Sequence, residues 1–337
     1  MSRSVMVTGG AGFIGSELVR QLAAAGDRVS VVDNLVNGKR ANLEPASGDV
    51  TLHQTDLRDG EALRALIEGV EVVFHLACLG VRHSIHAPLE NHEVNAGATL
   101  ALLELARAAG VKRFVYVSSS EVYGTARHVP MDEEHPTYPM TVYGASKLAG
   151  ECYTRAYFET YAFPGVVVRP FNTYGPRSHH EGDSGEVIPK WMLRCLAGRP
   201  MVVFGDGTQS RDFLFVEDTA RGIAAAATPD AALGQTINLA SGRDVVLLDL
   251  AREIAAVCGK AETPLVHDIA RPGDVKRLCG DATRARRLLG FEPRVLWGEG
   301  LGKLRDWYAA QGASPEALLE QERVRNWTAP DQEEKHV

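Results

Sequence analysis

A tyrosine and a lysine four residues apart, Tyr143 and Lys147 in the segment YGASK, have the types and spacing of an acid–base pair. Side chains at i and i+4 share one face of a helix. A free phenol has a pKa near ~10 and is a poor base at neutral pH. A neighbouring ammonium favours the phenolate and lowers that pKa. The pair could therefore remove a proton from a hydroxyl. The alternative is an exposed aromatic and cation on a helix, so the surrounding segments must decide.

A glycine-rich segment near the start predicts a phosphate-binding turn. Gly9, Gly12 and Gly15 are spaced G-x-x-G-x-x-G, after a predicted strand and at the start of a predicted helix. Gly9 permits the tight turn, Gly12 lets the backbone approach a pyrophosphate, and Gly15 lets the helix pack close to the strand. The helix N-terminus then stabilises the anion. The segment therefore predicts a bound dinucleotide.

Two acids follow the next predicted strands. Asp33 ends the second strand, where a carboxylate accepts hydrogen bonds from the adenosine ribose hydroxyls. An acid there disfavours a 2′-phosphate, so we predict NAD rather than NADP. Asp56 follows the third strand. It could contact the adenine amino group or cap a helix, and both readings remain open.

The elements that must position these residues alternate along the first 170 residues. Short β-branched runs alternate with longer amphipathic stretches, which predicts a doubly wound parallel sheet. The predicted strands are Val5–Thr8, Arg28–Val32, Val50–Gln54, Val72–Leu76, Phe114–Ser118 and Val166–Arg169. The predicted helices among them include Ile14–Ala25, Ala62–Glu68, Asn91–Ala109 and Ser146–Tyr161.

The regular alternation of predicted strands and helices ends after Pro170, where a Gly/Pro/His-rich loop begins. We predict an α/β protein with a Rossmann-type sheet and a smaller C-terminal α/β lobe that binds the substrate. The dinucleotide domain would span residues 1–176 with a return near 209–245. The smaller lobe would span 177–208 and 246–315, and 316–337 would form a tail, of which Asp331–Val337 frays.

Composition excludes several classes of protein. The net charge of −7 argues against non-specific nucleic-acid binding, which needs a basic surface. No stretch reaches the ~18 apolar residues of a membrane span, and the first residues do not resemble a signal peptide. The five cysteines are far apart and form no C-x-x-C, as in a reducing compartment. We therefore expect a cytoplasmic protein that binds neither nucleic acid nor membrane.

Several further motifs carry a resemblance that covers roughly residues 4–310. They are TGGAGFIG at 8–15, Asp33-Asn34, HLA at 75–77, SSSEVYG at 118–124, YGASK at 143–147, RPFNTYGPR at 169–177 and RDFLFVED at 211–218. With them the chain resembles an extended short-chain dehydrogenase/reductase of the nucleotide-sugar epimerase/dehydratase family. The resemblance implies oxidation of a sugar C4 hydroxyl with NAD that stays bound and is recycled.

The resemblance also assigns roles to individual residues. Tyr143 would be the base and Lys147 its activator, and Ser119 would orient the sugar oxygen. The substrate diphosphate would contact Asn172, Arg211 and Arg271, and more weakly Arg177, with a surface ion pair as the alternative reading for each arginine. The cofactor would contact Gly9, Gly12, Phe13, Ile14, Gly15, Asp33, Asn34, Asp56, Leu57, Leu76, Ala77, Ser118, Tyr143 and Lys147.

Glu121 divides the reactions of this family. A carboxylate two residues after Ser119 is similar to the arrangement of 4,6-dehydratases and uronic-acid decarboxylases, where it could act at C5. Many dehydratases have an aspartate where this chain has Ser120, however, and the tyrosine segment resembles that of epimerases. We therefore predict a nucleotide-sugar 4-epimerase, with a 4,6-dehydratase as the alternative and a decarboxylase third. Glu121 could instead bond to nearby backbone or an arginine.

Two further expectations complete the prediction. His179 and His180 are adjacent and lack partners at metal-ligand spacing, so we expect a loop over the substrate mouth and no metal site. His75 should be a packed core residue. The family resemblance implies a homodimer in which the helices at 91–109 and 146–161 pair with those of a second copy.

Overall fold

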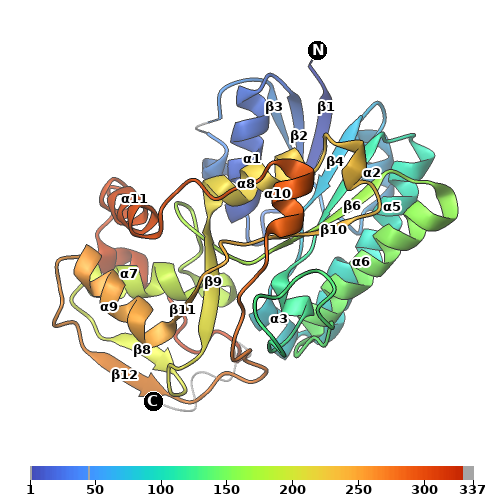
Figure 1. Cartoon of the computed structure of the whole chain (residues 1–337). Coiled ribbons are helices and arrows are strands. Elements are labelled where there is room, and N and C mark those ends of the chain that lie inside the picture. Colours follow the sequence, from blue (N-terminus) through green and yellow to red (C-terminus); the bar gives the residue numbers. More distant parts are fainter. Residues whose placement is uncertain (1, 45, 329–337) are drawn as a thin grey trace.

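The computed structural model describes residues 2–44 and 46–328. The chain folds into two lobes (Figure 1). The larger lobe holds a seven-stranded sheet in the order β10-β6-β5-β4-β1-β2-β3, and each pair of neighbours is parallel. Its strands are β1 (Ser4–Thr8), β2 (Arg28–Asp33), β3 (Val50–Gln54), β4 (Val72–His75), β5 (Arg113–Val117), β6 (Gly165–Pro170) and β10 (Thr236–Leu239). The predicted Rossmann-type sheet is confirmed.

The inner strands β1, β4, β5 and β6 form because their side chains, many of them β-branched, are buried on both faces. On one face, Val7 and Phe74 pack against α1 (Phe13–Ala24) and α8 (Val216–Ala225). On the other face, Met6 packs in a core with α2 (Gly60–Leu66) and α5 (Ala98–Ala108). The long helix α6 (Val142–Tyr161) runs beside α5 (Figure 1). Helices on both faces leave the carboxyl ends of the strands open for a ligand.

The smaller lobe holds two short sheets and several helices. One sheet has the order β11-β9-β7 and the other pairs β12 with β8. Its elements are β7 (Asn172–Tyr174), α7 (Val187–Leu196), β8 (Met201–Phe204), β9 (Ser210–Phe215), β11 (Asp244–Val246), α9 (Leu247–Val257), β12 (Leu265–Asp268), α11 (Trp297–Ala309) and α12 (Pro315–Leu319). The core of this lobe includes Trp191, Phe215, Leu250 and Leu304.

The chain crosses between the lobes more than once. In the stretch expected to return to the larger lobe, α8 and β10 do so, whereas β9 belongs to the smaller lobe. Helix α10 (Thr283–Leu289) also packs on the larger lobe. The boundary is therefore not a single cut.

The described part of the expected tail, 316–328, packs against the smaller lobe instead of extending from it. Glu322 forms an ion pair with Arg194 at 2.8 Å, and the Arg323 carbonyl accepts a hydrogen bond from Lys190 Nζ at 2.7 Å. Trp327 is buried and contacts the Phe204 ring. Residues 329–337, including the stretch expected to fray, lie outside the described residues.

Two helices differ from their predicted bounds for local reasons. Helix α6 begins at Val142 because the Thr141 side chain accepts a hydrogen bond from Gly144 N at 3.1 Å. The helix predicted at 91–109 is divided into α4 (Pro88–His92), a π-helical turn (Glu93–Gly97) and α5. The Thr99 hydroxyl, in the first turn of α5, donates to the Asn95 carbonyl of the π-helical turn at 2.6 Å. Such bonds compete with the helical ladder.

No helix among the described residues is long and apolar enough to cross a membrane.

Candidate active site

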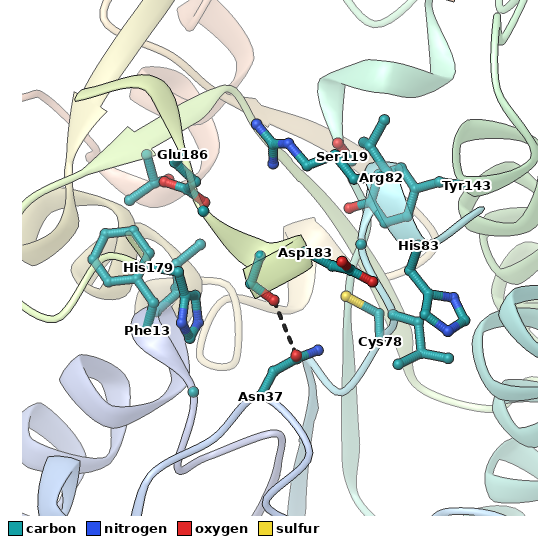
Figure 2. Close-up of a pocket in the computed structure, with 18 of the residues that line it drawn as sticks. Phe13, Asn37, Cys78, Arg82, His83, Ser119, Tyr143, His179, Asp183 and Glu186 are labelled. Atoms are coloured by element: carbon teal, nitrogen blue, oxygen red, sulfur yellow. Dashed lines mark hydrogen bonds between the residues drawn. The ribbon is translucent and has the colours of Figure 1, made fainter. Parts of the chain in front are cut away.

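A cavity of about 540 Å³ lies between the lobes at the carboxyl ends of the strands. Every cofactor residue predicted from the sequence lines it, as do Ser119, Glu121, Asn172, Arg211 and Arg271. Figure 2 shows Ser119, Arg82 and Tyr143 on one side of the cavity, with Phe13, His179 and Glu186 opposite. Arg177 is the one predicted site residue that does not line the cavity.

The glycine turn fits the pyrophosphate of a dinucleotide. Gly9 has a φ of +70°, and a Cβ there would lie 2.7 Å from Ala77 N. A Cβ on Gly15 would collide with the Gly9 carbonyl oxygen. The turn therefore packs directly on the backbone after β4, and only glycines allow this. The shape leaves the N-terminus of α1 facing the cavity, where it can stabilise an anion.

Asp33 ends β2 and lines the same cavity. Its carboxylate accepts hydrogen bonds from Ala11 N at 3.0 Å and Leu35 N at 2.8 Å. Burial raises its pKa, and these two bonds oppose the shift. A Cβ on Gly38 would lie 2.7 Å from the carboxylate, so the following loop passes close to it. The arrangement fits a carboxylate that accepts hydrogen bonds from the hydroxyl groups of a ribose.

Asp56 also lines the cavity but does not cap a helix. Hydrogen bonds from Arg58 hold the pKa of its carboxyl well below the usual range, and Asn34 Nδ2 donates to it at 3.0 Å. The side chain that caps α2 is Asp59, which accepts from Ala62 N at 3.0 Å. The capping alternative for Asp56 is therefore wrong.

The candidate base, Tyr143, lies one helical turn before Lys147 on α6. Burial raises the pKa of the Tyr143 phenol well above its usual value, and a hydrogen bond with Ser119 opposes the shift. Burial also lowers the pKa of Lys147, whose ammonium lies 4.6 Å from the centre of the Tyr116 ring. The shift of the phenol is thus opposite to the one expected from spacing, because burial dominates and the charges of Glu121 and Glu186 raise the pKa further.

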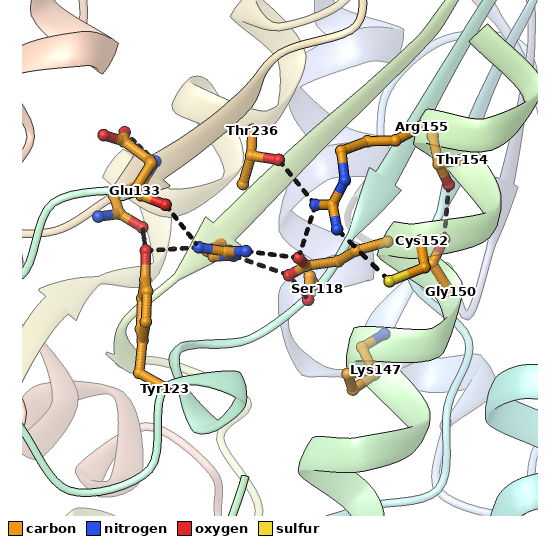
Figure 3. Close-up of polar contacts among 12 residues, drawn as sticks. Ser118, Tyr123, Glu133, Lys147, Gly150, Cys152, Thr154, Arg155 and Thr236 are labelled. Atoms are coloured by element: carbon orange, nitrogen blue, oxygen red, sulfur yellow. Dashed lines mark hydrogen bonds and ion pairs between the residues drawn. The ribbon is translucent and has the colours of Figure 1, made fainter. Parts of the chain in front are cut away.

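A buried polar network explains why Ser119, not Ser118, is available to a substrate. Ser118 Oγ donates to Glu151 at 2.5 Å, and Glu151 also pairs with Arg169 at 2.6 Å (Figure 3). Arg169 continues the network to the Tyr123 hydroxyl at 2.7 Å. Ser118 is therefore committed to the protein interior. The Ser119 hydroxyl accepts a hydrogen bond from Glu121 N at 3.2 Å and also hydrogen-bonds with the Tyr143 phenol, so it stays on the side of the cavity.

Glu121 has a carboxylate that could take part in chemistry. The side chain is 9% exposed, and its Oε2 is buried without a hydrogen-bond partner among the described residues. It acts electrostatically on Tyr143 and Arg211, and no ion pair joins it to an arginine in the described chain. Neither structural role considered for Glu121, a bond to backbone or to an arginine, is present there. Ser120 beside it is buried and supplies no carboxyl group.

The residues predicted to hold a diphosphate are only partly brought together. Arg211 and Arg271 both line the cavity, and both bind one oxygen of Asp274, Arg211 at 2.8 Å. Asn172 lines it too, with a buried Oδ1 that lacks a partner in the described chain. Arg177 instead pairs with Glu17 on α1 at 2.8 Å. The ion-pair alternative therefore holds for Arg177.

Sequence reasoning missed several polar residues of the cavity, among them Cys78, Arg82 and Glu186. Arg82 lies on the short helix α3 (Val81–His86) and Glu186 precedes α7. No spacing in the sequence sets them apart, because the two segments are about a hundred residues apart and meet only through the fold. The motif HLA at 75–77 lies near Cys78 and Arg82 in the sequence, but it indicates a contact with the cofactor and not with the substrate.

The stretch 178–186, here called the strap, lies over the cavity between the lobes. Ser184 donates to Asn37 at 2.9 Å (dashed in Figure 2), and Lys39 pairs with Glu181 at 2.6 Å. His86 on α3 contacts Asp183 at 2.7 Å. The two adjacent histidines of the strap, His179 and His180, belong to no cluster suited to a metal among the residues that the structure describes.

His75 is a packed core residue, as predicted. It is 1% exposed and lies between the Thr8 and Thr99 hydroxyls, at 2.7 and 2.8 Å. Burial lowers its pKa to about 3. It is therefore neutral and structural.

Fold and site together define an NAD-dependent enzyme of the extended short-chain dehydrogenase/reductase class. The chain belongs to the NAD dependent epimerase/dehydratase family, whose model matches residues 5–240. It is 38% identical over 308 residues to a UDP-glucose 4-epimerase of Mycolicibacterium smegmatis, covering 90% of this chain and 97% of the relative.

Solved structures give the same assignment. An epimerase of Methanothermobacter thermautotrophicus superposes with a TM-score of 0.89 at 34% identity, covering 95% of both chains. DesIV, a dTDP-glucose 4,6-dehydratase of Streptomyces venezuelae solved with NAD bound, gives 0.87 at 32% identity, covering 91% of this chain and 97% of that one. The family therefore includes epimerases and dehydratases at similar distance from this chain.

Proposed function

We propose that the chain is an NAD-dependent nucleotide-sugar 4-epimerase that works through a transient 4-keto sugar. The observation that carries the proposal is which side chains surround Tyr143 in the cavity. Tyr143, Lys147 and Ser119 line one cavity with the glycine turn, whereas Ser120 stands where a dehydratase needs a second acid. Removal and return of a C4 hydride needs only the first three residues.

The residues divide the work as follows. Tyr143 takes the proton from the C4 hydroxyl and gives it back when the 4-keto sugar is reduced. Bound NAD supplies the hydride acceptor and donor for the same carbon. Ser119 donates to the sugar oxygen, and Lys147 holds a positive charge beside the nicotinamide ribose. Arg211, Arg271 and Asn172 bind the diphosphate, so that the hexose can turn over while the nucleotide stays anchored.

A 4,6-dehydratase is the second candidate, and Glu121 favours it. Its carboxylate has a buried oxygen with no partner in the described chain and faces the same cavity as Tyr143. Such a group could remove the C5 proton from a 4-keto sugar. A uronic-acid decarboxylase ranks third, since the segment YGASK departs from the tyrosine segment usual in that group.

The test is incubation of the NAD-loaded protein with UDP- and dTDP-hexoses in deuterated water, followed by NMR. A product inverted at C4 with no deuterium at C5 supports the epimerase. A 6-deoxy-4-keto product with deuterium at C5 contradicts it and supports the dehydratase.

Glu121→Gln provides a second and independent measurement. An epimerase should lose less than about tenfold in kcat, because Glu121 moves no proton in that reaction. A dehydratase should lose about 10²–10⁴-fold, the usual contribution of a general base. Asp132→Asn, outside the cavity lining, is the matched control. We also propose that the enzyme works in the cytoplasm.

A further inference from the structure

Arg82 is a charged side chain of the cavity that the proposed mechanism does not use. It extends from α3 into the cavity, on the side of Ser119 and Tyr143 (Figure 2). No hydrogen bond or ion pair joins its guanidinium to another residue of the described chain. Arg82 is half-buried and lines the cavity, so its five N–H donors are accessible to a ligand there. The described part of the protein therefore provides no acceptor for the donors of this side chain.

A second arginine approaches Arg82 from the opposite lobe. Burial and the charge of Arg271 lower the pKa of Arg82 to about 10, so that it remains cationic at neutral pH. Glu186 and Glu121 attract it from a distance, but neither forms an ion pair with it. Two guanidinium groups that face one cavity repel each other, and an anion between them would remove that repulsion.

The two cavity arginines assigned to the diphosphate are already partly neutralised. Arg211 and Arg271 share the single carboxylate of Asp274. The three groups together carry one net positive charge, whereas the diphosphate of a nucleotide sugar carries two negative charges. Arg82 is the cavity arginine whose charge and donors are not committed to a carboxylate among the described residues.

We propose that Arg82 and Arg271 form an anion subsite that closes on an anionic oxygen group of the substrate from both lobes. The inference rests on the proposed function for the nature of that substrate. The anionic group has two sources in a nucleotide sugar, the diphosphate or a carboxylate on the hexose. Bidentate binding by arginine suits either.

The test measures binding to NAD-saturated protein, with no turnover required. Titration calorimetry compares UDP, UDP-glucose and UDP-glucuronic acid, with the dTDP series in parallel, and inorganic pyrophosphate is a probe that needs no base. The variants are Arg82→Gln and Arg82→Lys. Arg252→Gln, an exposed arginine on α9, is the matched control for net charge.

If the diphosphate is the anion, Arg82→Gln should weaken every nucleotide and pyrophosphate by about 10- to 100-fold, the range for a charge-assisted hydrogen bond. Arg82→Lys should retain part of the affinity, and Arg252→Gln all of it. If the carboxylate is the anion, only UDP-glucuronic acid should weaken. Unchanged binding of all ligands to a folded Arg82→Gln protein would overturn the proposal.

The outcome is separable from that of the proposed function. Binding that depends on Arg82 in a protein without C4 chemistry would retain the subsite and reject the epimerase. Normal epimerisation together with ligand binding that does not change in Arg82→Gln would support the epimerase and reject the subsite.

Discussion

The Tyr143 phenol is harder to ionise in this cavity than its spacing to Lys147 suggests. Burial raises its pKa, and repulsion from Cys78, Glu121 and Glu186 acts in the same direction. The hydrogen bond with Ser119 is the side-chain contact that favours the phenolate. Besides its proposed role in orienting the sugar oxygen, Ser119 would therefore make the proposed base easier to ionise.

Replacing this phenol should separate chemistry from cofactor binding. Tyr143→Phe should lower kcat by at least about 10²–10⁴-fold, because the hydroxyl that moves the proton is gone. The NAD content of the purified protein, measured by absorbance after denaturation, should stay at the wild-type level. Near-normal turnover in a protein of wild-type NAD content would refute the assignment of the base.

His75 makes the folded state sensitive to acid. Its pKa is about 3 when folded and ~6.5 when unfolded, so the unfolded chain binds one more proton between these values. Its contribution to the free energy of unfolding is therefore complete above pH ~6.5 and declines as the pH falls towards 3. In urea titrations, His75→Gln should flatten this decline by up to about 1.4 kcal/mol per pH unit. His92→Gln, which is exposed, should leave it unchanged.

At the scale of elements, six of the seven strands of the large sheet could be predicted closely, whereas β10 lies in the expected return near 209–245 and is not predicted as a strand. The inner strands are buried on both faces, and this burial leaves a continuous apolar pattern in the sequence. Helix α3 and the packed segment 315–328 could not be predicted in this way, because they are short and depend on contacts with distant residues. The π-helical turn escaped prediction because side-chain bonds to backbone leave no periodic signal.

The junction of β1 and α1 offers a direct test of the glycine turn. Gly15→Ala should weaken NAD binding, because its Cβ would collide with the Gly9 carbonyl and displace the turn. Such overpacking costs about 1–3 kcal/mol. Gly302→Ala on α11 meets nothing within 4 Å and should instead stabilise the fold by about 0.5–1 kcal/mol. Thermal unfolding with and without NAD measures both effects, and wild-type NAD affinity in Gly15→Ala would contradict the model of the turn.

At the scale of the molecule, the motifs located the cofactor half of the site and left much of the substrate half unresolved. The glycines, Asp33 and Tyr143 belong to segments with fixed spacing, so they could be found in the sequence. Arg82 and Glu186 face each other only because two lobes close around one cavity. The segment RPFNTYGPR at 169–177 resembles the family motif and therefore predicts that Arg177 binds the substrate, but in the fold Arg177 forms an ion pair with Glu17 on α1.

The outer face of α5 and α6 leads us to propose a homodimer. Leu100 on α5 and Val142 and Tyr161 on α6 are exposed at 38%, 40% and 54%. Light scattering should give twice the 36.5 kDa mass of one chain, and Leu100→Glu should produce monomers. Leu296→Glu, at an exposed leucine just before α11, is the control that should stay dimeric. A wild-type protein of single-chain mass would refute the proposal.

The strap has a kinetic consequence for the cofactor. Its contacts with Asn37 and Lys39 in the loop after β2, and with His86 on α3, lie at the cavity mouth, so we expect all three contacts to separate before a dinucleotide leaves. The residence time of NAD should then exceed the time of many turnovers. On that timescale the dinucleotide would behave as a prosthetic group, and under the proposed mechanism a hydride taken from a sugar would return to the same molecule before any exchange with the surrounding pool.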